Sequence, residues 1–131
     1  MFVDASALTS MVLGEADSIE LAARLQHADV RMTSPLSVWE AATAVSRVLT
    51  VSPSSAGEII LAYLRDVNID LVEIPTEVTS TAISAFERYG KGRHKAKLNF
   101  GDCFSYACAK HFRQPLMFKG DDFALTDVDV A

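Results

Sequence analysis

Cysteine and histidine are scarce in this sequence. Two cysteines and three histidines occur among 131 residues. Cys103 and Cys108 lie five positions apart in a segment with a helical pattern, and this spacing turns two side chains to different flanks of a helix. We therefore expect two buried, reduced thiols and no disulfide. The histidines are scattered without the spacing of metal ligands, which argues against a zinc site.

Long hydrophobic runs and internal repeats are also missing. No apolar stretch approaches the roughly 20 residues that span a bilayer, and Asp4 precedes the first apolar run in place of a positively charged segment, unlike a secretory signal peptide. We expect a cytoplasmic protein without membrane association. On a scale of roughly 100–200 residues per domain, the length predicts a single domain over residues 1–131. A hydrophobic share of 50% excludes the disordered and fibrous classes.

Positive charge is in deficit, since 12 basic residues face 17 acidic ones for a net charge of −5. This balance excludes a protein that coats nucleic acid with a uniformly basic surface. One segment nevertheless departs from it, because five basic side chains fall within ten residues that hold no acid: Arg88, Lys91, Arg93, Lys95 and Lys97. The segment is either a solvated loop or a contact for a phosphate backbone.

Short apolar runs alternate with longer segments of helical periodicity along the chain. Strands are predicted near residues 1–3, 30–33, 70–74 and 115–118, and helices near residues 5–13, 15–26, 35–49, 53–67, 76–89 and 100–111. Such alternation indicates an α/β fold, with a small parallel sheet of about 4–5 strands flanked on both faces by about 6–7 helices.

Several acids follow the predicted strands, at the sheet edge where ligands of open parallel sheets bind. Asp4 follows the first strand, Asp121 and Asp122 follow the last, and Asp102 lies three residues after the predicted helix cap Asn99. Gathered carboxylates repel one another unless a cation neutralises them, and Mg²⁺ or Mn²⁺ suits oxygen ligands. Taken singly, each acid also fits a helix N-terminus or a turn.

Glu40 has a different pattern from these acids. In the helix predicted over residues 35–49, the apolar side chains form one stripe, and Glu40 points nearly opposite to it. Helical periodicity therefore favours a solvent-exposed face for Glu40, although its apolar neighbours in Val38-Trp39-Glu40-Ala41-Ala42 leave a partly sheltered position open. Spacing alone does not select it as a site residue.

Three segments and one glutamate, in the order in which they occur along the chain, resemble the PIN-domain ribonucleases and specifically the VapC toxins of bacterial toxin–antitoxin pairs. The resemblance covers essentially the whole chain. It rests on Met1-Phe2-Val3-Asp4-Ala5-Ser6-Ala7-Leu8, on Glu40, on Leu98-Asn99-Phe100-Gly101-Asp102-Cys103-Phe104, and on Phe118-Lys119-Gly120-Asp121-Asp122-Phe123. The segment Arg88–His94 also resembles one branch of these toxins, although Lys95 stands where that branch has proline.

The resemblance implies a PIN-like fold and a Mg²⁺-dependent endoribonuclease in which Mn²⁺ can substitute. Asp4, Glu40 and Asp102 are then the acidic core, with Asp121 as the fourth metal-binding and catalytic acid and Asp122 as its alternative. Further substrate contacts are expected from a small set of polar and basic residues: Ser6, Lys91, Arg93, Lys95, Lys97 and Lys119. The implied partners are an RNA substrate, a cognate antitoxin and a second copy of the chain, in a homodimer or a larger toxin–antitoxin complex.

Two other functions compete with this interpretation. A receiver-like signalling domain also binds Mg²⁺ at strand ends, but it needs paired acids after its first strand and an aspartate after a middle strand, where this chain has a single Asp4 and Pro75. A PIN-like binding module with a silent site would be favoured if one of the four acids were missing, and none is.

Overall fold

A four-stranded parallel sheet forms the centre of the computed structural model, which describes all residues from 1 to 131. The strands are β1 (Phe2–Val3), β2 (Met32–Thr33), β3 (Asp70–Leu71) and β4 (Leu116–Met117), in the order β3-β2-β1-β4. Every neighbouring pair is parallel. The predicted α/β class with a small parallel sheet is thereby confirmed.

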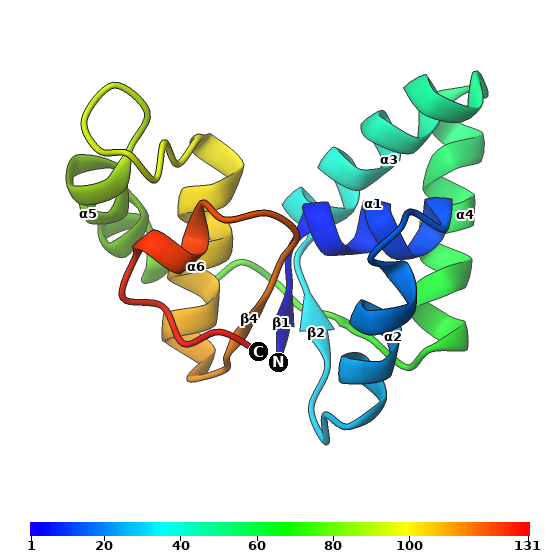
Figure 1. The fold of residues 1–131 in the computed structure, drawn as a ribbon, viewed down its shortest axis with the longest axis horizontal. Helices are drawn as coiled ribbons and strands as arrows, with labels where there is room; N and C mark the ends of the chain where they lie inside the picture. The colour runs from blue at the N-terminus through cyan, green and yellow to red at the C-terminus, as the bar shows by residue number, and fades with distance from the viewer.

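Six α-helices cover the sheet, and their number agrees with the sequence prediction. They are α1 (Ala5–Leu13), α2 (Ser18–Gln26), α3 (Pro35–Leu49), α4 (Pro53–Asp66), α5 (Val78–Tyr89) and α6 (Phe100–Phe112). A short 3₁₀ turn, η1 (Phe123–Leu125), follows β4. Figure 1 shows α1 to α4 on one side of the strands and α5 with α6 on the other. No helix is both long enough and apolar enough to cross a membrane.

The two residues of β1 show how the sheet joins two hydrophobic cores. Successive side chains of a strand point to opposite faces. Phe2 packs into the cluster built on α5 and α6, whereas Val3 packs into the cluster built on α1, α3 and α4. Both side chains are completely buried. The two faces of the sheet are thus covered, as is usual for parallel sheets.

Two predicted elements differ most from the structure at one end. The helix predicted from Glu15 begins at Ser18, because the Glu15 amide bonds back to the Ser10 carbonyl and the Ser10 hydroxyl donates to Asp17. The strand predicted over residues 70–74 ends at Leu71, where it forms the sheet edge. Tertiary contacts and edge position set these limits.

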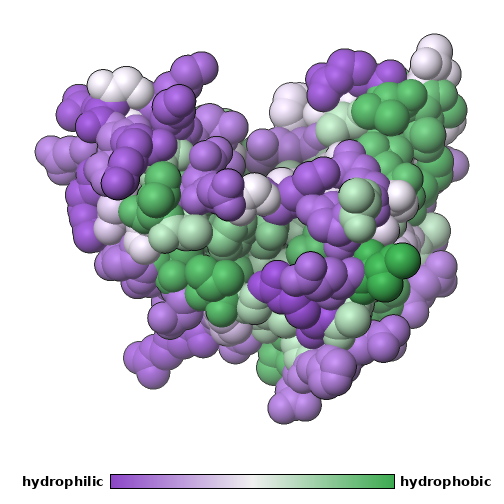
Figure 2. Space-filling model, viewed as in Figure 1, coloured by the Kyte–Doolittle hydropathy of each residue, from purple (hydrophilic) through white to green (hydrophobic).

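Polar caps fix where three helices begin. Asp4 is the N-cap of α1, Ser34 caps α3 and Asn99 caps α6, each with a side chain that accepts a hydrogen bond from the first turn. In Figure 1 these three helix starts lie at the upper end of the strands. Figure 2 shows that the outline of the molecule is hollowed at this end, between the α3 side and the α5 side.

The two cysteines, Cys103 and Cys108, are both free and buried in α6. Burial raises the pKa of each thiol to about 11, and the charge of Asp102 adds to the effect at Cys103. The prediction of two buried, unpaired thiols is confirmed.

Candidate functional site

Asp4 is a buried carboxylate held on several sides. It is 4% exposed at the junction of β1 and α1. Its Oδ2 atom accepts hydrogen bonds from the Ser6 amide at 2.9 Å and the Ser6 hydroxyl at 2.6 Å. Its Oδ1 atom accepts one from the Ser105 hydroxyl at 2.6 Å. These donors are all neutral, so they orient the Asp4 carboxylate without neutralising its negative charge.

Asp102 is fixed by a reciprocal pair of hydrogen bonds at the start of α6. Its Oδ2 atom accepts from the Asn99 amide at 2.9 Å, and the Asn99 Oδ1 atom accepts from the Asp102 amide at 2.9 Å. This capping box follows from the local sequence alone. Burial raises the pKa of Asp102 to about 6, the Asn99 amide opposes the rise, and the charges of Asp4 and Asp122 add to it.

Glu40 reaches the same place from α3. Its carboxylate lies against the α6 backbone at Gly101, where an added Cβ atom would stand 2.0 Å from the Glu40 Oε1 atom. Burial, followed by the charges of Asp4 and Asp102, raises the pKa of Glu40 to about 7. Glu40 is half-buried, so the structure shows the partly sheltered position that its apolar neighbours left open, and the solvated face favoured by helical periodicity is wrong. Helix α6 covers part of the Glu40 side chain, and the spacing of apolar residues along α3 gives no information about this contact between two helices.

Three carboxylates from distant parts of the chain therefore share one electrostatic environment. None of Asp4, Glu40 and Asp102 takes part in a salt bridge. The structure contains no ready-made group of three histidine, cysteine or acidic side chains at metal-ligand spacing. The charges of Asp4 and Asp102 act on Glu40, and the charge of Asp4 acts on Asp102. An all-oxygen donor set of this kind fits a hard divalent cation.

The two acids after β4 differ in their effect on this group. Asp121 and Asp122 are both exposed. The charge of Asp122 contributes to the raised pKa of Asp102, and Asp121 is not among the causes of that shift. The sequence prediction preferred Asp121 as the fourth acid, whereas Asp122 is the one of the two whose charge acts on Asp102.

Comparison with known proteins shows the family and the fold of this chain. The family model of the PIN domain matches residues 1–129. Ribonuclease VapC30 of Mycobacterium tuberculosis is 38% identical over 128 residues, a match that covers 98% of this chain and 95% of that protein. The chain belongs to the PIN-domain family, in its VapC branch.

Two solved structures share the fold. One is VapC20 of Mycobacterium tuberculosis, described as a toxin that cleaves the sarcin–ricin loop, with a TM-score of 0.76 and 18% identity over 99% of this chain and 97% of that chain. The other is a toxin–antitoxin complex from Klebsiella pneumoniae, with a TM-score of 0.71 and 15% identity over 99% of this chain and 95% of that chain. These likenesses establish the PIN-like fold.

The basic segment forms an ordered loop between α5 and α6. Hydrogen bonds from the Lys91 amide to Leu98 and from the Leu98 amide to Tyr89 close it at its base. Ala96 is fully buried beneath it. Four exposed cations line a shallow concave surface here and take part in no salt bridge: Lys91, Arg93, Lys95 and Lys97. Arg88, the first cation of the run, lies 3.6 Å from Asp127 instead.

Ser6 and Lys119, both predicted to contact substrate, are engaged within the protein. The Ser6 hydroxyl donates to Asp4 and accepts from the Lys119 amide at 3.0 Å. The Lys119 ammonium forms salt bridges with Glu15 and Asp17. In this arrangement Ser6 orients Asp4, and Lys119 ties the segment after β4 to the turn before α2.

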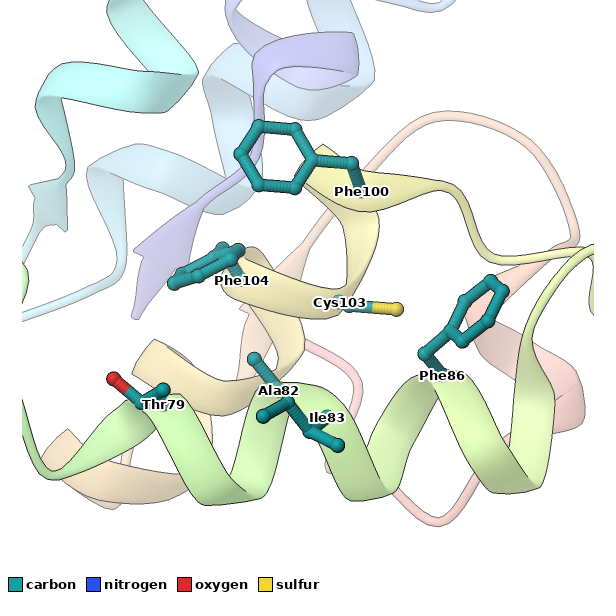
Figure 3. Close-up of a pocket in the computed structure, with 7 residues that line it drawn as sticks. All are labelled: Thr79, Ala82, Ile83, Phe86, Phe100, Cys103 and Phe104. Carbon is teal, nitrogen blue, oxygen red and sulfur yellow. The ribbon is translucent and has the colours of Figure 1, made fainter.

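An apolar groove lies next to Asp102, one of the three acids Asp4, Glu40 and Asp102 that we call the acidic group. It has a volume of about 290 Å³ and runs between α5 and α6, where Figure 3 shows its lining residues Thr79, Ala82, Ile83, Phe86, Phe100, Cys103 and Phe104. The first turn of α6 serves both sites, because it gives Phe100 and Cys103 to the groove and carries Asp102. The groove, and the roles of Gly101 and Ser105, were not predicted from the sequence. Their only local signal is their spacing from Asp102.

The contact between Glu40 and Gly101 predicts an effect of Gly101→Ala. The new Cβ atom should push the Glu40 carboxylate away from Asp4 and Asp102, so the pKa of Glu40 should fall from about 7 toward its ordinary value. The fold should survive, because only the end of a flexible side chain must move and alanine favours a helix by about 1 kcal/mol. An NMR titration of the Glu40 carboxyl carbon measures the shift.

Gly57→Ala in α4 is the matched control for that substitution, since an added Cβ atom meets nothing within 4 Å. It should raise the thermal stability slightly and leave the Glu40 titration unchanged. An unaltered pKa of Glu40 in Gly101→Ala would contradict the geometry described above.

The raised carboxyl pKa values also predict how stability depends on pH. Because Glu40 and Asp102 bind protons more tightly in the folded than in the unfolded chain, their contribution to the free energy of unfolding falls as pH rises from about 4 to about 7. Glu40→Gln should flatten this dependence and raise the melting temperature at about pH 8 by a few degrees. Thermal unfolding in EDTA tests this, with the exposed acid of α4 changed in Glu58→Gln as control. Equal pH dependence in wild type and Glu40→Gln would refute it.

Proposed function

We propose that this protein is a metal-dependent endoribonuclease and the toxin of a toxin–antitoxin pair, acting on RNA in the cytoplasm. The observation that carries the proposal is the convergence of Asp4, Glu40 and Asp102 at one end of a parallel sheet, with no lysine or arginine side chain in a salt bridge to any of them. Membership of the VapC branch supports RNA cleavage as the reaction, since relatives in this branch are named ribonucleases.

The acidic side chains are suited to hold Mg²⁺, with Mn²⁺ as a substitute, since both cations prefer oxygen ligands. Asp4, Glu40 and Asp102 would bind the ion together with Asp122 or Asp121. When bound, such an ion lowers the pKa of a coordinated water and stabilises negative charge on phosphate oxygens. The chain's part is to keep the carboxylates ionisable and oriented, through neutral donors at Asp4 and the capping box at Asp102.

The basic loop is suited to hold phosphates on either side of the scissile bond. Its unpaired cations at Lys91, Arg93, Lys95 and Lys97 directly precede Asn99 and the first turn of α6. A strand bound along the loop would therefore continue toward Asp102. Phosphate contacts of this kind position a substrate without reading its sequence.

An antitoxin segment is the partner that we propose for the apolar groove. Ile83 is 67% exposed and Phe100 is 68% exposed, so large apolar side chains of the groove are open to water. A segment seated there would also cover the approach to Asp102 across the shared turn of α6. One of the structures with this fold is a toxin–antitoxin complex. A homodimer is likewise part of the proposal.

Cleavage of a mixed small-RNA substrate tests the proposed function. Purified protein without partner should cleave with Mg²⁺ or Mn²⁺, and EDTA should abolish cleavage. Asp102→Asn preserves the shape of the capping box but removes a charged ligand, so activity should fall by more than the roughly 10–100-fold typical of residues that only support a ligand. Its circular dichroism should match the wild type. Equal cleavage by both proteins would rule the assignment out.

The matched pair Asp121→Asn and Asp122→Asn identifies the fourth acid in the same assay. Because the charge of Asp122 acts on Asp102, we expect Asp122→Asn to reduce cleavage more than Asp121→Asn. A larger loss of cleavage in Asp121→Asn would instead support Asp121, the residue predicted from the sequence, as the fourth acid.

The role of the basic loop predicts a change in the salt dependence of RNA binding. Each contact with a phosphate of single-stranded RNA contributes about 0.7 to the slope of log affinity against log salt concentration. Alanine at positions 91, 93, 95 and 97 together should reduce that slope by roughly 2–3, measured in the Asp102→Asn background by fluorescence anisotropy. Arg65→Ala, on α4, is the control. An unchanged slope would show that the loop does not contact RNA.

A further inference from the structure

A row of buried serine hydroxyls lies beneath the acidic group, and we call it the serine chain. It consists of Ser34, Ser37 and Ser105, each no more than 2% exposed. The Ser34 and Ser37 hydroxyls are 3.1 Å apart, and those of Ser37 and Ser105 are 3.5 Å apart. The chain ends where the Ser105 hydroxyl donates to Asp4 Oδ1 at 2.6 Å.

The serine chain links the same three elements that carry the acids. Ser37 precedes Glu40 by three residues on α3, and Ser105 follows Asp102 by three residues on α6. Residues three apart lie on the same face of a helix. The serines thus join α3 to α6, and α6 to Asp4, directly alongside the acids.

Asp4 Oδ1 depends on a single protein donor. Ser6 supplies both hydrogen bonds to Oδ2, whereas Ser105 supplies the one to Oδ1. With Ser6 alone, the carboxylate plane could pivot about its Oδ2 anchor. The bond from Ser105 fixes that plane relative to α6 and therefore relative to Asp102.

We propose, on the basis of the proposed function, that Ser105 is a positioning residue that holds the Asp4 carboxylate in the orientation required for binding a divalent cation. Packing alone does not call for a hydroxyl here, because the neighbouring buried positions of α6 at Ala107 and Ala109 are filled by methyl groups. Partners of metal ligands typically change metal affinity or activity by about 10–100-fold when they are removed.

Calorimetric titration of Mn²⁺ into the full chain tests the proposal. Ser105→Ala should weaken Mn²⁺ binding by about 10–100-fold and lower kcat, with little change in the KM for RNA because the basic loop is intact. Ser105→Thr retains the hydroxyl and should restore much of the affinity. Ser37→Ala, one step farther from Asp4, should have a smaller effect.

Ser10→Ala is the matched control, because Ser10 is also fully buried and its hydroxyl donates to Asp17, away from the three acids. It should lower the melting temperature about as much as Ser105→Ala while leaving Mn²⁺ affinity unchanged. Equal Mn²⁺ affinities for the two alanine variants would overturn the positioning role. If Ser105→Ala does not fold, Ser105→Cys, with similar volume and a weak donor, takes its place in the same comparison. A wild type that neither binds Mn²⁺ nor cleaves RNA would instead refute the proposed function.

Discussion

Mutual repulsion among carboxylates is the constraint on which the arrangement of this protein depends. Burial alone raises a carboxyl pKa, and neighbouring negative charges raise it further, as at Glu40 and Asp102. A lysine or arginine among them would relieve the repulsion but would also occupy the place proposed for a metal ion. The chain instead uses neutral hydroxyl and amide donors, which orient a carboxylate and leave its charge available.

The fold brings these charges together although its β-sheet is very small. Each strand has only two residues, yet four parallel strands suffice to align the helix starts at one end. The caps at Asp4, Ser34 and Asn99 then set where α1, α3 and α6 begin. Two of these caps directly position acids, since Asp4 is itself a cap and Asp102 completes the capping box of Asn99.

Features determined by local sequence were predictable, and features determined between helices were not. The strand–helix order and the places of Asp4 and Asp102 follow from caps and strand ends, which lie within a few residues of each other. Glu40 could be assigned only through a family resemblance, because its burial comes from α6. Gly101 and Ser105 escaped for the same reason, since each matters through contact with a residue at least 60 positions away in the chain.

The distribution of charge explains why net charge was a poor guide to partners. The acidic group lacks cations, the basic loop lacks acids, and the remaining ammonium near the acids, at Lys119, is paired with Glu15 and Asp17. Opposite charges that paired across this end of the molecule would cancel both sites. Kept apart, the acids stay available for the proposed cation and the loop for the proposed phosphate contacts, both of them next to the start of α6.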